Sequence, residues 1–145
     1  MFFSEFNKIV SDMKMRKPRL FGLESDHIVG QSEISRIEES LKIDFPEKYK
    51  AFLMHYGGGY FGYTVVFSCD SQGEFYLLDK VSKEWIYTHH FLPVLDFETG
   101  DVGGYRIFGG RCSEVFEVYL HDKNTIIEDS DGDLFLALLK YGLKI

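Results

Sequence analysis

Apolar residues recur at helical spacing through most of the first third of the chain. Phe2, Phe6, Val10 and Met13 fall on one side of a helix, which predicts an amphipathic helix over the first dozen or so residues. The basic stretch that follows, residues 14–25, is interrupted by a proline and a glycine and is therefore interpreted as a connector.

A second helix is predicted to begin near Ser32, a residue type that favours the N-cap position. Its apolar residues Ile34, Ile37 and Leu41 share one face, and charged residues occupy the positions between them. This pattern is typical of a helix that buries one side.

A third helix is predicted to end at Tyr56. Asp44 and Glu47 have the spacing of a capping box, and Pro46 suits the first turn because its missing N–H would be unpaired there in any case. The next residue after Tyr56 is Gly57, the residue type that commonly ends a helix.

From Tyr60 onward the pattern changes to short β-prone runs separated by Gly, Asp, Ser and Asn. The six runs are YFGYTVVFS, EFYLLD, EWIYTHHF, LPVLDF, GYRIFG and EVFEVYLHD. In the last run, alternation puts Val115, Glu117, Tyr119 and His121 on one side, which predicts a strand with one face in water. The segment between Ile107 and Val115 contains Gly109 and Gly110, which predicts that the strands of the last two runs form an antiparallel hairpin.

The order of these elements predicts an α+β fold. A closing helix is expected from Ser130, which has capping-box spacing to Asp133, to Gly142. Helices, then strands, then a helix favour an antiparallel-rich twisted sheet, with the N-terminal helices and the C-terminal helix packed on one face. We expect residues 1–145 to form one domain, because the length is that of a common single domain.

Composition and charge narrow the classes of partner. The chain is 45% hydrophobic and has 16 basic and 23 acidic residues, a formal net charge of −7. Direct nucleic-acid binding is disfavoured, because such binding depends largely on Lys and Arg, whereas encounter with a basic protein is favoured. No signal-peptide pattern and no run of about 18 apolar residues occur, so we expect a cytoplasmic protein with no membrane contact.

The glycines of the stretch HYGGGYFGY raise the question of a phosphate site. Gly57, Gly59 and Gly62 have the G-x-G-x-x-G spacing of dinucleotide-binding loops. Those loops follow a strand and open a helix, whose N-terminus binds the phosphate. Here a helix precedes the glycines and a β-prone run follows them, so the favoured interpretation is a helix stop and the start of a strand.

Other candidate chemistry is weak in this sequence, and we expect no cofactor, no metal and no catalytic residues. The acidic run at 128–133 lacks the order and spacing of a calcium loop. His89 and His90 would point to opposite faces of a strand. Cys69 and Cys112, the only cysteines, form no C-x-x-C pair and are predicted to be buried free thiols.

The segment EISRIEESLKIDFPEKYKAFLMHYGGGYFG resembles a characteristic motif of the SUKH superfamily, which includes yeast cell-wall synthesis regulators and bacterial immunity proteins of toxin systems. The matching positions are Ile34, Glu38, Leu41, Phe45, Pro46, Tyr49, Phe52, Leu53, Gly58 and Gly59. The later segments LPVLDFETGDVGGYRIFG, EVFEVYLHD and DLFLALLKYG are similar to the remaining blocks of that family. The resemblance implies a SUKH-like fold and a non-enzymatic protein-binding domain, commonly one that neutralises a toxin.

Our leading hypothesis is therefore an immunity protein that binds a basic toxin, such as a nuclease, or a related regulator of cell-wall synthesis. The alternative is a small-ligand or nucleotide-binding regulatory domain, and an enzyme using Cys112 or a histidine is a third. As the partner-binding surface we name an acidic corner, formed by Glu128, Asp129, Asp131 and Asp133. The oligomeric state stays open, because exposed strand edges are able to pair.

Overall fold

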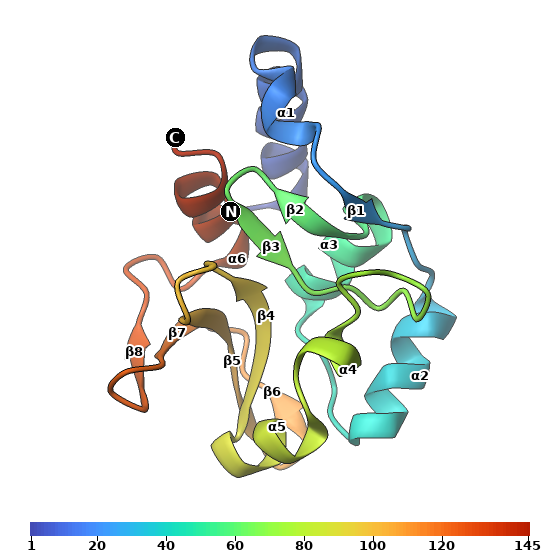
Figure 1. Ribbon diagram of the computed structural model, residues 1–145, viewed down its shortest axis with the longest axis vertical. Helices are drawn as coiled ribbons and strands as arrows, with labels where there is room; N and C mark the ends of the chain where they lie inside the picture. Colours follow the sequence, from blue (N-terminus) through green and yellow to red (C-terminus); the bar gives the residue numbers. More distant parts are fainter.

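The computed structural model describes residues 1–145 and combines helices with an eight-stranded antiparallel sheet (Figure 1), which confirms the predicted α+β class. The helices are α1 (Phe3–Arg16), the 3-10 helix η1 (Pro18–Phe21), α2 (Gln31–Leu41), α3 (Glu47–Tyr56), α4 (Leu77–Lys80), α5 (Lys83–His89), α6 (Leu134–Ala137) and the π-helix η2 (Leu138–Gly142). The strands are β1 (Ser25–Asp26), β2 (Gly58–Phe61), β3 (Thr64–Val66), β4 (Phe91–Asp96), β5 (Val102–Phe108), β6 (Arg111–Cys112), β7 (Glu117–Leu120) and β8 (Thr125–Glu128). None of the helices combines the length and the apolar character needed to cross a membrane.

The strands are arranged in the order β1-β2-β3-β4-β5-β7-β8, and every neighbouring pair is antiparallel. The short strand β6 also pairs with β5, outside this path. The hairpin predicted between the last two β-prone runs is confirmed, because β5 pairs with β7. The sheet therefore ends at β1 on one side and at β8 on the other, and neither of these strands was predicted.

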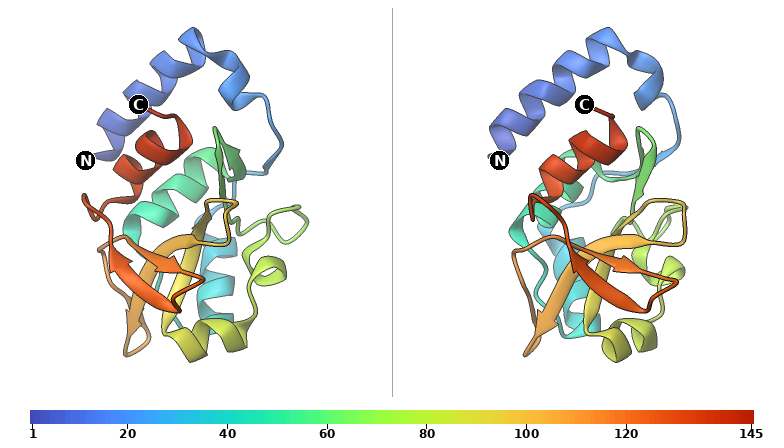
Figure 2. Two further views of the ribbon diagram at one scale, coloured as in Figure 1. Left: turned by 60° about the vertical axis from the view of Figure 1, so that its left-hand side comes forward. Right: turned by 90° about the vertical axis from the view of Figure 1, so that its left-hand side faces the viewer.

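A cluster of aromatic rings fixes the helices α1, α3 and α6 to one another and to β2. Phe6 of α1 is fully buried. Its ring centroid lies 4.7 Å from that of Phe135 in α6, 5.8 Å from that of Phe61 in β2 and 6.4 Å from that of Phe52 in α3. Figure 2 shows the result, in which α1 lies across α6 and α3.

Helix α5 packs against the opposite face of the sheet. The Trp85 ring stacks on His89 with 3.9 Å between centroids and meets the edge of Tyr119 at 5.2 Å. Since side chains alternate along a strand, Tyr119 points away from its neighbour Val118, which belongs to the main core. The sheet is thus covered on both faces at β7.

The prediction of strands in EFYLLD and EWIYTHHF is wrong, because EFYLLD begins in a turn and ends in α4, and most of EWIYTHHF lies in α5. Their aromatic residues favour strands, but the Ser82 hydroxyl accepts the Trp85 N–H at 3.1 Å and caps α5. His89 is the last residue of α5, and His90 follows it with a left-handed φ of 50°. The two histidines therefore do not alternate across a strand as predicted.

The predicted water-facing side of EVFEVYLHD is right at its ends, where Val115 and His121 are exposed, and wrong in the middle. Glu117 and Tyr119 are each 8% exposed. The carboxylate of Glu117 accepts a hydrogen bond from Arg106 Nε at 3.0 Å, and α5 covers Tyr119. An ion pair and an unpredicted helix thus bury residues that alternation alone assigned to solvent.

The starts of α2 and α3 differ from the predicted caps. The N-cap of α2 is Gly30, whose N–H is accepted by the Glu33 carboxylate at 2.7 Å, so Ser32 lies within the first turn. Pro46 is the N-cap of α3, and Asp44 lies outside the helix. There the backbone of Asp44 forms a bridge with β6.

The structure confirms that the glycine-rich stretch ends a helix and starts a strand. Gly57 follows α3 with a φ of 83°, β2 begins at the next residue, and Gly62 turns the chain from β2 into β3. Gly62 is pressed against η2, because a Cβ placed on it would lie 2.0 Å from the Gly142 carbonyl oxygen. The Tyr63 N–H also donates to that oxygen, at 2.9 Å.

We predict that Gly62→Ala destabilises the protein more than Gly109→Ala. Both glycines have a left-handed φ, 59° and 56°, but no atom lies within 4 Å of a Cβ placed on Gly109. The backbone strain of about 1 to 2 kcal/mol is common to both variants, and the collision with η2 adds about 1 to 3 kcal/mol for Gly62 alone. Urea denaturation measures the two free energies of unfolding, and equal losses would contradict the close contact.

Candidate functional site

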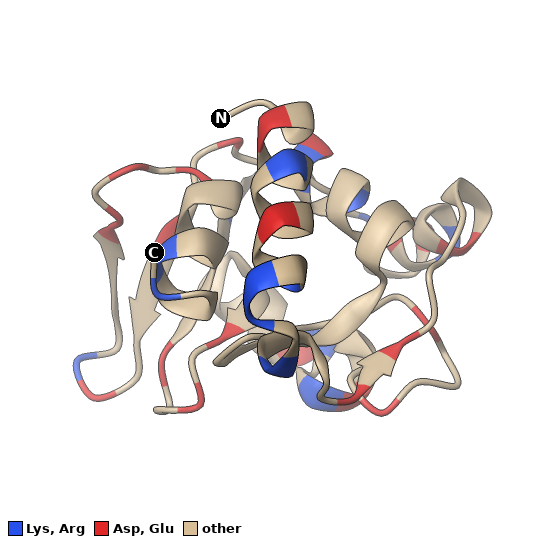
Figure 3. Cartoon of the chain, turned by 90° about the horizontal axis from the view of Figure 1, so that it is seen from above, with Lys and Arg blue, Asp and Glu red and all other residues tan.

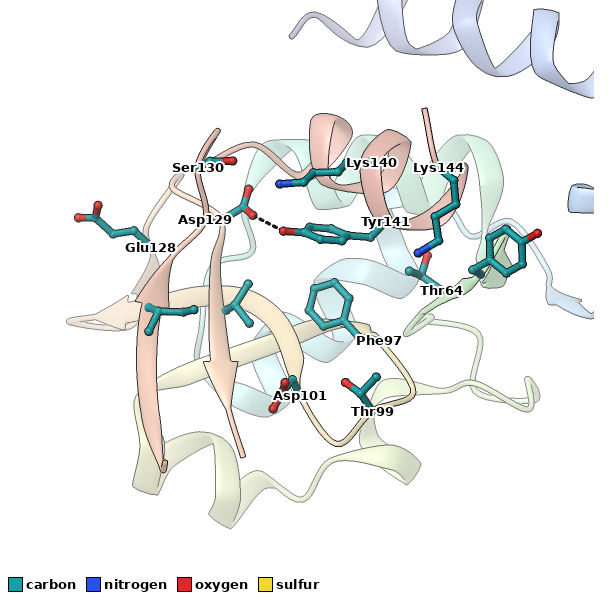
Figure 4. Close-up of a pocket in the computed structure, with 13 residues that line it drawn as sticks. Thr64, Phe97, Thr99, Asp101, Glu128, Asp129, Ser130, Lys140, Tyr141 and Lys144 are labelled. Carbon is teal, nitrogen blue, oxygen red and sulfur yellow. Dashed lines mark hydrogen bonds between the residues drawn. The ribbon is translucent and has the colours of Figure 1, made fainter. Parts of the chain in front are cut away.

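A groove of about 430 Å³ lies between the β7–β8 hairpin, the loop that follows β4, and the C-terminal helix (Figure 4). Its volume is in the range of pockets that hold small ligands or side chains. We refer to this pocket as the groove.

The apolar part of the groove is built from three separate segments. Val118 of β7 and Ile127 of β8 are cross-strand partners, so their side chains share one face of the hairpin. Phe97 follows β4, and its ring meets that of Tyr141 from η2 edge to face, with 5.1 Å between centroids. Ile127 is 43% exposed, so part of this apolar surface is open to solvent.

One carboxylate in the groove is only half satisfied. Asp129 Oδ1 accepts a hydrogen bond from the Tyr141 hydroxyl at 3.0 Å, but Asp129 Oδ2 is buried and has no hydrogen-bond partner. Burial, followed by this contact with Asp129, raises the pKa of Tyr141, which keeps the hydroxyl a donor. A buried polar atom without a partner is costly, and a donor group that enters the groove would complete the pairing.

Charges of opposite sign line the two sides of the groove. Asp101, Glu128 and Asp129 lie on the strand side, and Lys140 and Lys144 lie on the helix side. The Lys140 ammonium is 5.0 Å from the Tyr141 ring centroid, and its pKa is raised chiefly by the Tyr141 hydroxyl and then by nearby carboxylates. The Lys144 ammonium lies 5.6 Å from the centroid of Tyr63. Three carboxylates against two ammonium groups leave the lining acidic by one charge.

The structure brings only part of the predicted acidic corner together. Glu128 and Asp129 line the groove, and Asp131 is exposed on the segment that follows it. Figure 3 shows acidic residues along this connection between β8 and α6. Asp133 is buried and caps α6, accepting the Phe135 N–H at 2.8 Å, so the predicted cap at Ser130 is wrong.

Asp133 holds together elements of the core. Its Oδ2 atom lies 2.7 Å from Lys48 Nζ in α3 and 2.6 Å from the amino group of Met1. Burial opposes ionisation of this carboxyl, but the hydrogen bonds from Lys48, Met1 and the Phe135 N–H outweigh it, so the pKa of Asp133 is lowered. The bonds that Asp133 makes join α3, α6 and Met1, which precedes α1.

The groove residues that were not predicted from the sequence are mainly aromatic residues and lysines. Phe97, Tyr141, Lys140 and Lys144 carry no motif, because each is an ordinary loop or helix residue in the sequence. They converge only because the C-terminal helix lies beside the β7–β8 hairpin. No local spacing could have identified them as one site.

The other candidate reactive groups are poorly placed for chemistry. Cys69 and Cys112 are buried free thiols, as predicted, and burial raises the pKa of each to about 12. Both therefore remain protonated at neutral pH and are weak nucleophiles. No group of three or more His, Cys, Asp or Glu side chains is arranged to hold a metal ion. His89 Nδ1 contacts only the Trp85 carbonyl oxygen of its own helix, at 2.8 Å.

Comparison with known families identifies a family to which most of the chain is similar. The model of the SMI1/KNR4 family (SUKH-1) matches residues 29–141, which run from just before α2 into η2 and include most of the groove. No curated protein gives a significant match to the chain. The matched range includes the segment in which the sequence resembles the SUKH superfamily, and it extends that resemblance through the sheet.

We predict that Asp133→Asn lowers the free energy of unfolding at neutral pH by about 1.5 to 3 kcal/mol, the contribution typical of hydrogen bonds to a charged group. Asp131→Asn, which changes an exposed carboxylate, is the matched control and should change it by less than about 0.5 kcal/mol. Urea denaturation of both variants measures this difference. A loss as large in Asp131→Asn would contradict the assignment of the structural role to Asp133.

The lowered pKa of Asp133 predicts that the stability lost in Asp133→Asn depends on pH. The folded-state pKa of Asp133 is below its ordinary value of 3.8, so ionised Asp133 stabilises the fold above about pH 4, and this stability is lost as pH falls through the lowered pKa. The stability difference between the protein and Asp133→Asn should therefore shrink between about pH 6 and about pH 2. A difference that is constant over this interval would contradict the lowered pKa.

Proposed function

Because the chain belongs to the SMI1/KNR4 family (SUKH-1), we propose that it is a non-enzymatic domain that binds a basic protein and neutralises it, as an immunity protein does with a toxin. The observation that carries this proposal is the unpaired oxygen of Asp129 in the groove. A Lys or Arg side chain of the partner would enter the groove and donate to this oxygen.

The charge of the chain supports a basic partner. A net charge of −7 attracts a basic protein over long range and raises the rate of encounter. Asp101 and Glu128 also line the groove and add negative potential to that of Asp129. The faces of Phe97 and Tyr141 provide apolar contact for the methylene stem of the entering side chain.

The buried thiols support a binding role over catalysis. A cysteine nucleophile must be accessible and at least partly ionised, and both cysteines here are buried with a pKa raised to about 12. The groove itself holds aspartate, glutamate, lysine and tyrosine side chains, without a histidine or cysteine. The same binding mode would serve a regulator of cell-wall synthesis, which differs from an immunity protein in the partner that it binds.

A second candidate function is recognition of a small cationic ligand. The volume of the groove, about 430 Å³, is large enough for such a molecule, and aromatic rings lie beside the unpaired carboxylate oxygen. A thermal-shift screen distinguishes the two, because a ligand that binds only the folded chain raises the melting temperature. Stabilisation by small amines, without binding to any basic protein, would favour this candidate.

We predict that Asp129→Asn weakens binding to the partner by at least about 30-fold, because it removes one member of a desolvated charge pair worth about 2 kcal/mol or more. The partner is sought among the proteins encoded beside the gene of this chain, and the affinity is measured by isothermal titration calorimetry. Glu39→Gln, an exposed carboxylate on α2, is the matched control and should bind as the unmodified chain does.

The variant Asp129→Asn should fold normally, with a melting temperature close to that of the unmodified chain, because the residue is half-buried and the amide oxygen is still able to accept the hydrogen bond of the Tyr141 hydroxyl. If this variant binds the partner as tightly as the unmodified chain does, the groove is not the binding site. If none of the neighbouring proteins binds, and co-expression relieves no toxicity of theirs, the immunity role itself is wrong.

A further inference from the structure

The two edges of the sheet differ in how they are closed. Strand β1 has only two residues, both polar, and the loop that follows β3 is bonded to it. The Asp26 carboxylate accepts the N–H groups of Glu74 and Phe75, each at 2.9 Å. This edge is therefore too short and too occupied to accept another strand.

Strand β8 forms the other edge and is open. Outside its ladder with β7, Thr125–Glu128 takes part in no backbone hydrogen bond. Thr125, Ile127 and Glu128 are exposed, and Ile126 is half-buried. We call the outward-facing backbone of Thr125–Glu128 the open edge.

The open edge lacks several of the features that prevent pairing. Natural sheets protect their edge strands by keeping them very short, with charged side chains, with proline or with a bulge. Strand β8 is short, at four residues, and ends in Glu128, but it contains no proline and no lysine. Here β8 has two adjacent β-branched apolar residues at its centre, Ile126 and Ile127, and its register with β7 runs without a bulge. Such an edge is a ready template for a further strand.

We propose that an extended segment of the basic protein partner adds to the sheet as a ninth strand along the open edge of β8. This proposal rests on the proposed function and specifies how the partner is recognised. The backbone of the segment would bond to the outward N–H and C=O groups of β8, and its Lys or Arg side chains would face the carboxylates at the ends of the strand.

Charge decides between such a partner and a second copy of this chain. Asp122 precedes β8, and Glu128, Asp129 and Asp131 end it or follow it. Pairing of two copies would bring together two strands whose own and nearby charged residues, Asp122, Lys123, Glu128, Asp129 and Asp131, carry a net charge of −3 in each copy (one positive, four negative), which is unfavourable. Each copy also has a net charge of −7. A basic segment meets the same carboxylates with favourable pairs.

The test uses a library of displayed random peptides of about twelve residues as the probe. Selected peptides should alternate β-branched residues with Lys or Arg, and binding should slow hydrogen exchange at amides within residues 125–128. Selection of no peptide, or protection confined to other parts of the chain, would overturn the proposal.

Two proline variants provide the matched controls. N–H groups of successive residues in an edge strand point alternately to the neighbouring strand and outward. Of the two variants Ile126→Pro and Ile127→Pro, one therefore loses an outward N–H and the other loses an N–H that faces β7. The variant that loses the outward N–H should keep a melting temperature close to that of the Thr substitution at the same position. That proline variant should bind the selected peptides at least about tenfold more weakly than the Thr variant does, and equal binding would overturn the proposal.

Two further outcomes separate the alternatives. Analytical ultracentrifugation tests self-pairing. If the chain sediments as a dimer, and the proline variant that loses the outward N–H sediments as a monomer, β8 pairs with a second copy and the proposed partner strand is wrong. If a neighbouring protein binds in an Asp129-dependent manner but tolerates the outward proline, strand addition is wrong and the proposed function stands. If peptides bind at β8 while no basic protein is neutralised, the edge is a binding site and the immunity role is wrong.

Discussion

The packing of Phe6 against Phe135 is the contact on which the rest of the molecule depends. The two rings are nearly parallel, at 20°, with 4.7 Å between their centroids, and both are almost fully buried. Phe135 belongs to α6, and the helix continues without a break into η2, which carries Lys140 and Tyr141. Because Tyr141 reaches Asp129 from this helix, the geometry of the groove depends on an aromatic contact at the other end of the C-terminal helical segment.

The close contact between Gly62 and Gly142 sets the other end of that helix. The turn from β2 to β3 approaches η2 so closely that neither glycine has room for a side chain, since a Cβ on Gly142 would lie 2.8 Å from the Phe61 carbonyl oxygen. The glycines that resemble a phosphate loop in the sequence thus serve packing at Gly62 and chain reversal at Gly57. Their spacing is informative only together with the order of the elements around them.

The sequence was a good guide where one element buries one face. The buried residues of α1, α2 and α3 repeat at helical spacing, and all three helices were predicted from that spacing. It failed at α5, where aromatic residues favour a strand but the cap at Ser82 and packing on Tyr119 stabilise a helix. It also missed β8, whose four residues are mostly exposed and show no alternating burial. Tertiary contacts decide both cases, and no local pattern reports them.

Asp129 and Asp133 show why the candidate site could be predicted only in part. They are four residues apart in one acidic run, yet Asp133 has hydrogen bonds from Lys48, Met1 and Phe135, while Asp129 Oδ2 has none. The sequence reports the charge of each residue but not its partners, and the partners determine whether a carboxylate stabilises the isolated fold or awaits a ligand. The unpaired oxygen and the open edge of β8 lie within a few residues of each other. Each leaves hydrogen-bonding capacity unused in the free chain, and the basic extended segment that we propose as the partner would satisfy both.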